Sequence, residues 1–144
     1  MKRYLFSIAF VFAIFYSSLA LAERLAVSSY VANIRSGPGT EYSLLWKAGK
    51  YYPLLILDKS GKWLHFRNYK GDEGWIKRSL VRKIPTVITK RTKCNIRSAP
   101  GTIHKKLATV GKGVPFKVIK AEGDWLNIQH SGGLIGWIHK SLVW

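Results

Sequence analysis

Nucleophilic and acid–base chemistry in this chain would have to come from one cysteine, four histidines and seven carboxylates. Cys94 together with a histidine could form a cysteine nucleophile. Cys94 stands two residues before Ile96, however, so strand alternation places both side chains on one apolar face. There a cysteine packs as a small apolar residue, and we expect Cys94 to be buried. The alternative in an oxidising compartment is an intermolecular disulfide.

The remaining ionisable groups do not cluster in the sequence. Asp72 and Glu73 are adjacent but fall in a predicted turn, and no two carboxylates are placed for glycosidase chemistry. No glycine-rich loop leads from a strand into a helix to cradle a phosphate. The histidines lack the spacing of a zinc site; they are His65, His104, His130 and His139. We therefore predict no catalytic site, no metal and no cofactor.

An internal repeat organises the rest of the chain. The segment NIRSGPGT at 33–40 recurs as NIRSAPGT at 95–102, an offset of 62 residues that holds to the C-terminus. Gly-x-Trp-Leu and Gly-Trp-Ile also occur twice, at 61–64 and 123–126 and at 74–76 and 136–138. The offset defines two units, residues 25–82 and 87–144, with a linker at 83–86.

Each unit has the pattern of a small all-β domain. Apolar and polar residues alternate at 63–67 and at 125–129, and glycines at regular intervals separate the predicted strands. No segment after residue 22 has a convincing helical period. Several short strands in so few residues favour a small, partly open barrel, which leaves few exposed strand edges.

The Asn-Ile-Arg-Ser-x-Pro-Gly start, the Gly-x-Trp-Leu middle and the Gly-Trp-Ile end together resemble the bacterial SH3-like domain. The resemblance covers both units. It implies an all-β fold of two tandem, five-stranded SH3-like barrels. It also implies a binding or targeting role, often at the cell envelope beside wall hydrolases and in contact with peptidoglycan. The resemblance transfers no particular ligand.

Residues shared by the two units have a structural and a binding interpretation. Arg35 and Arg97 could bind a carboxylate or phosphate in bidentate fashion, or satisfy backbone carbonyls within their own loop, and we favour the second. Trp63 and Trp125 follow a turn and begin a strand, so each is a candidate for the edge of a groove as well as for packing. Trp75 and Trp137 are expected in or near the core.

Residues that differ between the units are the stronger binding candidates, because the second unit folds without them. The first unit has additional aromatic residues, which we expect to face outward and to stack on sugars or hold peptides. The alternative is that they form the interface between the units. They are Tyr42, Trp46, Tyr51, Tyr52 and Tyr69, and their counterparts are His104, Ala108, Gly113, Val114 and Ser131.

The N-terminus indicates export. Lys2 and Arg3 precede an apolar run that ends in Ala20-Leu21-Ala22, the pattern of a signal peptide at 1–22 that is cleaved near Ala22. An uncleaved membrane anchor is the alternative. The chain has a net charge of +17, or +15 without Lys2 and Arg3. This charge favours anionic partners, although a generally basic proteome would explain it equally well.

The sequence thus predicts an exported, periplasmic or secreted, non-catalytic binding module of the bacterial cell envelope, with peptidoglycan or another anionic wall component as ligand. The alternative is a periplasmic interaction or scaffold module that binds a peptide or partner protein. We expect a cell-wall polymer or envelope protein as partner and no nucleic acid. Peripheral contact with an anionic membrane surface and the oligomeric state stay open.

Overall fold

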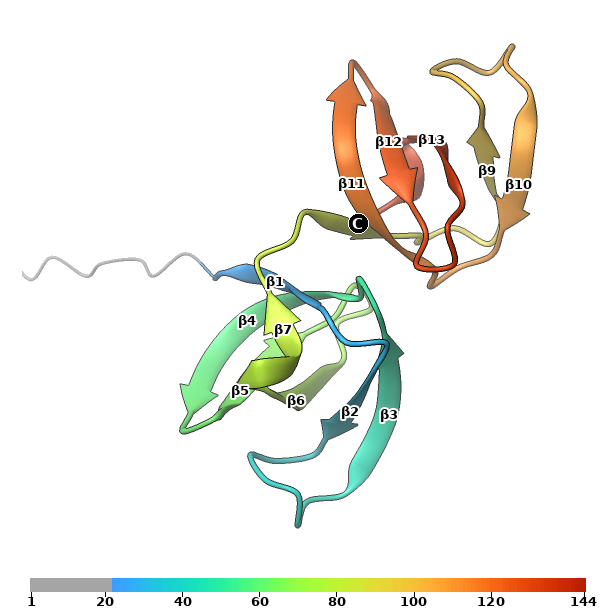
Figure 1. Cartoon of the computed structure of the whole chain (residues 1–144). Coiled ribbons are helices and arrows are strands. Elements are labelled where there is room, and N and C mark those ends of the chain that lie inside the picture. The colour runs from blue at the N-terminus through green and yellow to red at the C-terminus, as the bar shows by residue number, and fades with distance from the viewer. Residues whose placement is uncertain (1–21) are drawn as a thin grey trace, which may run out of the picture.

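A computed structural model describes residues 22–144 (Figure 1). The predicted signal peptide, apart from Ala22, lies outside the described residues. The first unit contains seven short strands and one 3-10 turn. They are β1 (Arg24–Val27), β2 (Val31–Arg35), β3 (Leu44–Gly49), β4 (Pro53–Ser60), β5 (Trp63–Arg67), β6 (Glu73–Lys77), η1 (Arg78–Leu80) and β7 (Val81–Arg82).

The second unit repeats this order. Its elements are β8 (Thr86–Ile88), β9 (Cys94–Arg97), β10 (Lys106–Val110), β11 (Pro115–Glu122), β12 (Trp125–Gln129), β13 (Ile135–His139) and η2 (Lys140–Leu142). The strand order is β3-β2-β6-β5-β4-β1-β7 in one sheet and β10-β9-β13-β12-β11-β8 in the other. The prediction of two all-β, SH3-like units is confirmed. Within residues 22–144, neither 3-10 turn nor any other helix is long and apolar enough to cross a membrane.

The two sheets match in register as well as in order. The hairpin of β4 and β5 has an irregularity after Ile56, and the hairpin of β11 and β12 has one after the equivalent Val118. Strand β7 pairs with β1 through Val27 and Val81, and the second unit keeps this contact as a bridge between Thr89 and Val143. The first sheet exceeds the five strands we predicted because of β1 and β7, and the second because of β8.

The Gly-Trp-Ile repeat has a packing explanation. In β6, Ile76 is fully buried, while Gly74 lies against the Ile34 side chain of the neighbouring β2. A Cβ atom at Gly74 would collide with Ile34, and the same holds for Gly136 and Ile96 in the second unit. Only glycine therefore lets β6 and β13 pass this close to β2 and β9.

Each unit has its own hydrophobic core. The first core is built around Leu54, Phe66 and Ile76, and the second around Phe116, Ile128 and Ile138. Cys94 belongs to the second core and is fully buried, as the alternation predicted. Two separate cores in this length of chain mean that each large apolar side chain contributes much of its unit's stability.

The two units touch around Arg24. Its Nη2 donates to the carbonyl oxygens of Thr86, at 3.2 Å, and Trp144, at 2.8 Å. The guanidinium carbon also lies 4.1 Å from the centroid of the Trp144 ring. We call these contacts the Arg24 clasp. Thr86 was predicted to end the linker, but it is the first residue of β8 and pairs with Lys117, which shortens the linker by one residue.

Candidate functional site

The structure forms one groove twice, once in each unit. The first groove has a volume of about 270 Å³ and the second about 210 Å³. Every residue that lines the first has its counterpart in the second at the 62-residue offset. The lining residues are Val31, Asn33, Arg35, Thr40, Trp63, Lys77 and Leu80 in the first groove, and Lys93, Asn95, Arg97, Thr102, Trp125, His139, Ser141 and Leu142 in the second.

An arginine fixes one wall of each groove. Arg35 Nη1 donates to the carbonyl oxygens of Thr40, at 3.2 Å, and Tyr42, at 3.0 Å, and so closes the loop after β2. Arg97 Nη1 donates to the His104 carbonyl at 3.0 Å. This is the structural role that the sequence favoured. A guanidinium carries five N–H donors, so donors remain to face a ligand carboxylate in the groove.

A tryptophan at the start of a strand also lines each groove. Trp63 and Trp125 are half-buried, so each ring packs on its unit and still presents a surface to the groove. In the second groove the His139 ring stands edge-on to Trp125, with centroids 5.3 Å apart. The structure thus places the predicted arginine and tryptophan of each unit in the same groove.

The grooves differ at two positions. Lys93 and His139 in the second replace Val31 and Lys77 in the first. The sequence reasoning missed Asn33, Thr40 and Lys77, although the first two lie in the repeated segment. Neither their type nor their spacing distinguishes groove residues from turn residues. They come together only in the folded sheet, where β6 pairs with β2 on one side and places Lys77 opposite Trp63 of β5 on the other.

Two of the aromatic residues predicted to face outward pack inward instead. Trp46 packs against the first core, with its ring edge-on to Phe66 at a centroid distance of 6.1 Å. Tyr52 also packs against this core and accepts a hydrogen bond from Asn68 Nδ2 at 3.1 Å. Burial raises the pKa of Tyr52, and the Asn68 hydrogen bond opposes this shift. The prediction of outward-facing side chains was wrong for both residues.

One side chain near the equivalent glycine differs between the units. The Trp46 ring approaches Gly74, whereas in the second unit Leu107 approaches the equivalent Gly136. Leu107 is the counterpart of Leu45, one position before that of Trp46. Ala108, the aligned counterpart of Trp46, packs against the second core, while Leu107 is 43% exposed.

Tyr69 and Tyr42 have other roles in packing. Tyr69 belongs to the interface between the units, since a Cβ atom at Gly113 would lie 2.9 Å from its hydroxyl oxygen. This is the alternative that we gave for the aromatic set, and it applies to Tyr69. Tyr42 is 42% exposed and lays its ring against Gly37 in the loop after β2.

Tyr51 is the aromatic candidate with an unusual backbone. Its φ of 72° is the only positive value at a non-glycine residue in 22–144, and its counterpart Gly113 has a φ of 85°. A bulky side chain is disfavoured in this region. Lys50 Nζ lies 5.4 Å from the Tyr51 ring centroid and 4.8 Å from that of Tyr30. Tyr30 is 74% exposed, and the sequence reasoning missed it although its counterpart is Thr92.

Cys94 is not placed as an accessible nucleophile. The fully buried Cys94 has a pKa raised by burial, and its Sγ lies 3.5 Å from the Arg91 carbonyl oxygen. A raised pKa keeps the thiol protonated and weakly nucleophilic. Within 22–144, no three His, Cys, Asp or Glu residues come together as a metal site.

Comparison with known proteins gives one family. The model of the bacterial SH3 domain matches residues 29–83 and again residues 90–144. A protein of Bacillus subtilis (strain 168) named "Putative N-acetylmuramoyl-L-alanine amidase YrvJ" is 29% identical over 152 residues. That alignment covers 94% of this chain but 29% of the relative, so the chain spans less than a third of the relative's length.

Two solved structures are similar at low TM-scores. NlpC2 from Trichomonas vaginalis has a TM-score of 0.36 and 17% identity, over 86% of this chain and 48% of that chain. An NLPC/P60 family protein from Bacillus cereus ATCC 10987 has a TM-score of 0.41 and 13% identity, over 85% and 56%. Scores this low have no bearing on the function of this chain.

Proposed function

Because this chain belongs to the bacterial SH3 domain family, we propose that it is an exported, non-catalytic binding module of the cell envelope that contacts peptidoglycan or another anionic wall component. The observation that carries the proposal is the duplicated groove, in which an arginine, an asparagine, a threonine, a tryptophan and a leucine recur at equivalent positions. The Bacillus subtilis relative is named as a putative N-acetylmuramoyl-L-alanine amidase, which supports a role at the wall.

The groove chemistry suits a polymer of sugars and short peptides. The exposed surface of Trp63 offers an apolar face on which a sugar ring can lie. The Asn33 amide can donate to and accept from acetamido and peptide groups. Arg35 and Lys77 supply positive charge for a peptide carboxylate. Each groove is small, so binding through both grooves at once would raise the apparent affinity by avidity.

A binding measurement on purified cell wall tests the proposal. The Trp63→Ala/Trp125→Ala variant should bind roughly thirtyfold more weakly than the unchanged chain, since truncating a tryptophan at a binding hot spot costs about 2 kcal/mol or more. The matched control is Leu57→Ala/Ile119→Ala, an equivalent pair of exposed apolar residues outside both grooves. Thermal unfolding would show that both variants remain folded.

Two results would overturn the groove proposal. One is the absence of wall binding by the unchanged chain at low salt. The other is equal loss of binding in the tryptophan variant and its control. A milder variant, Lys77→Gln/His139→Gln, changes exposed or half-buried polar residues of the grooves and guards against loss of folding.

A second candidate is a scaffold module that binds a protein. Strand β3 lies at an edge of its sheet and exposes Leu44 and Leu45, which are 47% and 48% exposed. An edge strand with apolar side chains can pair with an extended peptide segment. Co-purification of one stoichiometric protein partner from envelope extracts, lost on Leu45→Lys substitution, would favour this function over wall binding.

A further inference from the structure

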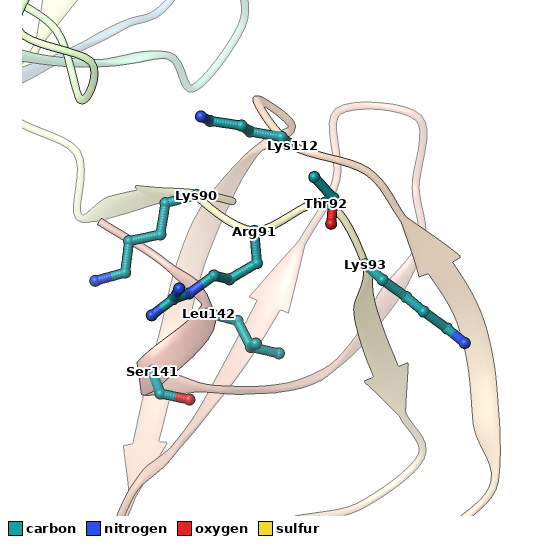
Figure 2. A pocket seen from close by; sticks show the side chains of 7 residues that line it. All are labelled: Lys90, Arg91, Thr92, Lys93, Lys112, Ser141 and Leu142. Carbon is teal, nitrogen blue, oxygen red and sulfur yellow. The ribbon is translucent and has the colours of Figure 1, made fainter.

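The turn between β8 and β9 carries a basic pocket that the grooves do not explain. Its volume is about 510 Å³, and it is lined by Lys90, Arg91, Thr92, Lys93, Lys112, Ser141 and Leu142 (Figure 2). We call it the basic pocket. It shares Lys93, Ser141 and Leu142 with the second groove and extends from there to Lys90, Arg91 and Lys112.

The backbone around the basic pocket is tied down. Lys90 N donates to the Leu142 carbonyl at 2.9 Å, which holds the turn against η2. The fully buried Thr89 Oγ1 donates to the Gly111 carbonyl and accepts from Val114 N, both at 2.8 Å. These bonds hold the segment that bears Lys112 next to the segment that bears Lys90 and Arg91. The basic side chains thus extend from backbone segments that hydrogen bonds hold in place.

In the part of the chain that the structure describes, no carboxylate forms an ion pair with these basic side chains. The four basic residues of the pocket are exposed, and its lining contains no acidic residue. Among residues 22–144, all three ion pairs lie in the first unit and involve Glu73 or Asp72. Four cations that repel one another raise the free energy of the folded state, so an anion that binds among them is favoured.

The same turn in the first unit shows that folding does not need these cations. Its counterparts of Lys90, Arg91 and Lys93 are Ser28, Ser29 and Val31, in a turn of the same topology. Lys112 alone has a basic counterpart, Lys50, and that lysine lies over aromatic rings. The cluster of charge is therefore a feature of the second unit and not of the fold.

We propose that the basic pocket binds phosphate groups carried on a repeating anionic polymer. In Figure 2 the side chains of Lys90 and Arg91 extend in the same direction across the view, while those of Lys93 and Lys112 extend in other directions. A phosphate has enough acceptor oxygens to meet a guanidinium and an ammonium together. The separated lysines would meet the neighbouring phosphates of the same polymer. This site goes beyond the groove function and does not depend on it.

The lining of the pocket favours a polymer over a membrane surface. Leu142 is its only apolar residue and is half-buried. Peripheral attachment to a bilayer relies on exposed apolar side chains that enter the interface as well as on charge. The pocket presents charge without such an anchor.

The test compares two variants of the whole chain that lose the same charge. The pocket variant is Lys90→Gln/Arg91→Gln/Lys112→Gln, which leaves every groove residue unchanged. The control is Lys47→Gln/Lys59→Gln/Lys105→Gln, which removes three exposed lysines outside the basic pocket. The probes are inorganic polyphosphate, polyglutamate and vesicles of phosphatidylglycerol in phosphatidylcholine, with affinity measured at two salt concentrations.

We expect the pocket variant to bind polyphosphate about tenfold more weakly or worse, with a shallower salt dependence, and the control to change by about threefold or less. Pyrophosphate should shift the backbone amide signals of residues 90–93 and 141–142 of the unchanged chain. The Trp63→Ala/Trp125→Ala variant should keep its affinity for polyphosphate, which separates this site from the grooves.

Several results would overturn the proposal. Equal weakening in both variants would show a diffuse charge effect. Polyglutamate binding as tightly as polyphosphate would show that phosphate is not selected. Tighter binding to vesicles that is lost in the pocket variant would assign the pocket to the membrane surface. Amide shifts spread over both units would show that no defined site exists.

Discussion

The two units have the same fold, but different residues fill their cores. The first core contains Leu54 on β4 and Phe66 on β5, and in the second core the equivalent positions hold Phe116 and Ile128. The phenylalanine has changed strands while the core holds one large and one smaller side chain in both units. Cores tolerate such exchanges when total volume is kept, so the comparison separates what the fold requires from what it merely contains.

The surfaces of the units diverge at one place above all. The turn after the first strand presents Tyr30 beside Lys50 and Tyr51 in the first unit, and Lys90 and Arg91 in the second. Over whole units, residues 25–82 contain ten basic and four acidic residues, and residues 87–144 contain ten and two. The units therefore differ less in the number of positive charges than in where these charges lie and in what offsets them.

Exchanging core residues between the units should change the free energy of unfolding more than any other substitution considered below. Leu54→Phe alone overpacks the first core, and Phe66→Ile alone leaves a cavity, so each should lower the free energy of unfolding by about 1–3 kcal/mol. The double variant copies the second core and should recover to within about 1 kcal/mol of the original. Urea unfolding measures all three.

If the double variant were as unstable as the sum of the single variants, the two cores would not be interchangeable. The reverse exchange in the second unit, Phe116→Leu with Ile128→Phe, is the matched control.

The backbone at Tyr51 gives the next largest effect. Tyr51→Gly copies Gly113 and removes a bulky residue from a positive φ, which should stabilise the first unit by about 1 kcal/mol. Gly113→Ala should destabilise the second unit, because alanine is strained at that φ. Thermal unfolding of both variants tests the pair.

A less stable Tyr51→Gly variant would contradict the strain argument. Weaker wall binding by a stabilised Tyr51→Gly variant would show that Tyr51 is held in this conformation for binding.

Removal of the Arg24 clasp should uncouple the units at a smaller cost. Arg24→Ala loses two hydrogen bonds and the contact with Trp144, worth about 1 kcal/mol for partly exposed groups. Both units should stay folded and tumble more independently, which relaxation of backbone amide nitrogens measures. Unchanged rotational correlation times in the two units would show that the linker and Tyr69 suffice to hold them.

High pH should affect the second unit first. The raised pKa of Cys94 means that the folded unit keeps the thiol protonated while the unfolded chain ionises near its ordinary value of 9.0. The contribution of this thiol to the free energy of unfolding is therefore fully present below that pH and is lost as the pH rises above it. The loss should be less than about 1 kcal/mol at pH 9.5. The raised pKa of Tyr52 should lower the stability of the first unit in the same direction, but only above the ordinary tyrosine pKa of 10.0. Unfolding in urea at pH 8.0 and pH 9.5, with Cys94→Ala as control, measures the difference.

The repeat itself made the fold predictable. Asn-Ile-Arg and Gly-Trp-Ile mark strands, and their glycines and isoleucines have fixed packing partners, such as Gly74 against Ile34. Cys94 was predictable for the same reason, because alternation along a strand determines which face a side chain occupies. The grooves were less accessible, since Arg35 and Trp63 come from segments that meet only in the folded unit.

Aligning the two copies showed which residues differ between the units, but it did not show which of these side chains face the solvent. Trp46 and Tyr52 differ between the copies yet pack on the core, whereas Tyr30 differs and is exposed. A position in an alignment does not say where a side chain points when a bulge turns the strand.

The sequence by itself determined a duplicated all-β chain of strongly basic charge with the motifs of the bacterial SH3 domain, because strand periodicity and turn residues are local properties. Only the tertiary structure decided which side chains gather: the arginine and tryptophan of each groove, the Arg24 clasp, and the cations of the basic pocket, where Lys112 joins Lys90 and Arg91. These groupings depend on long-range packing, in which a buried residue such as Thr89 ties distant segments together.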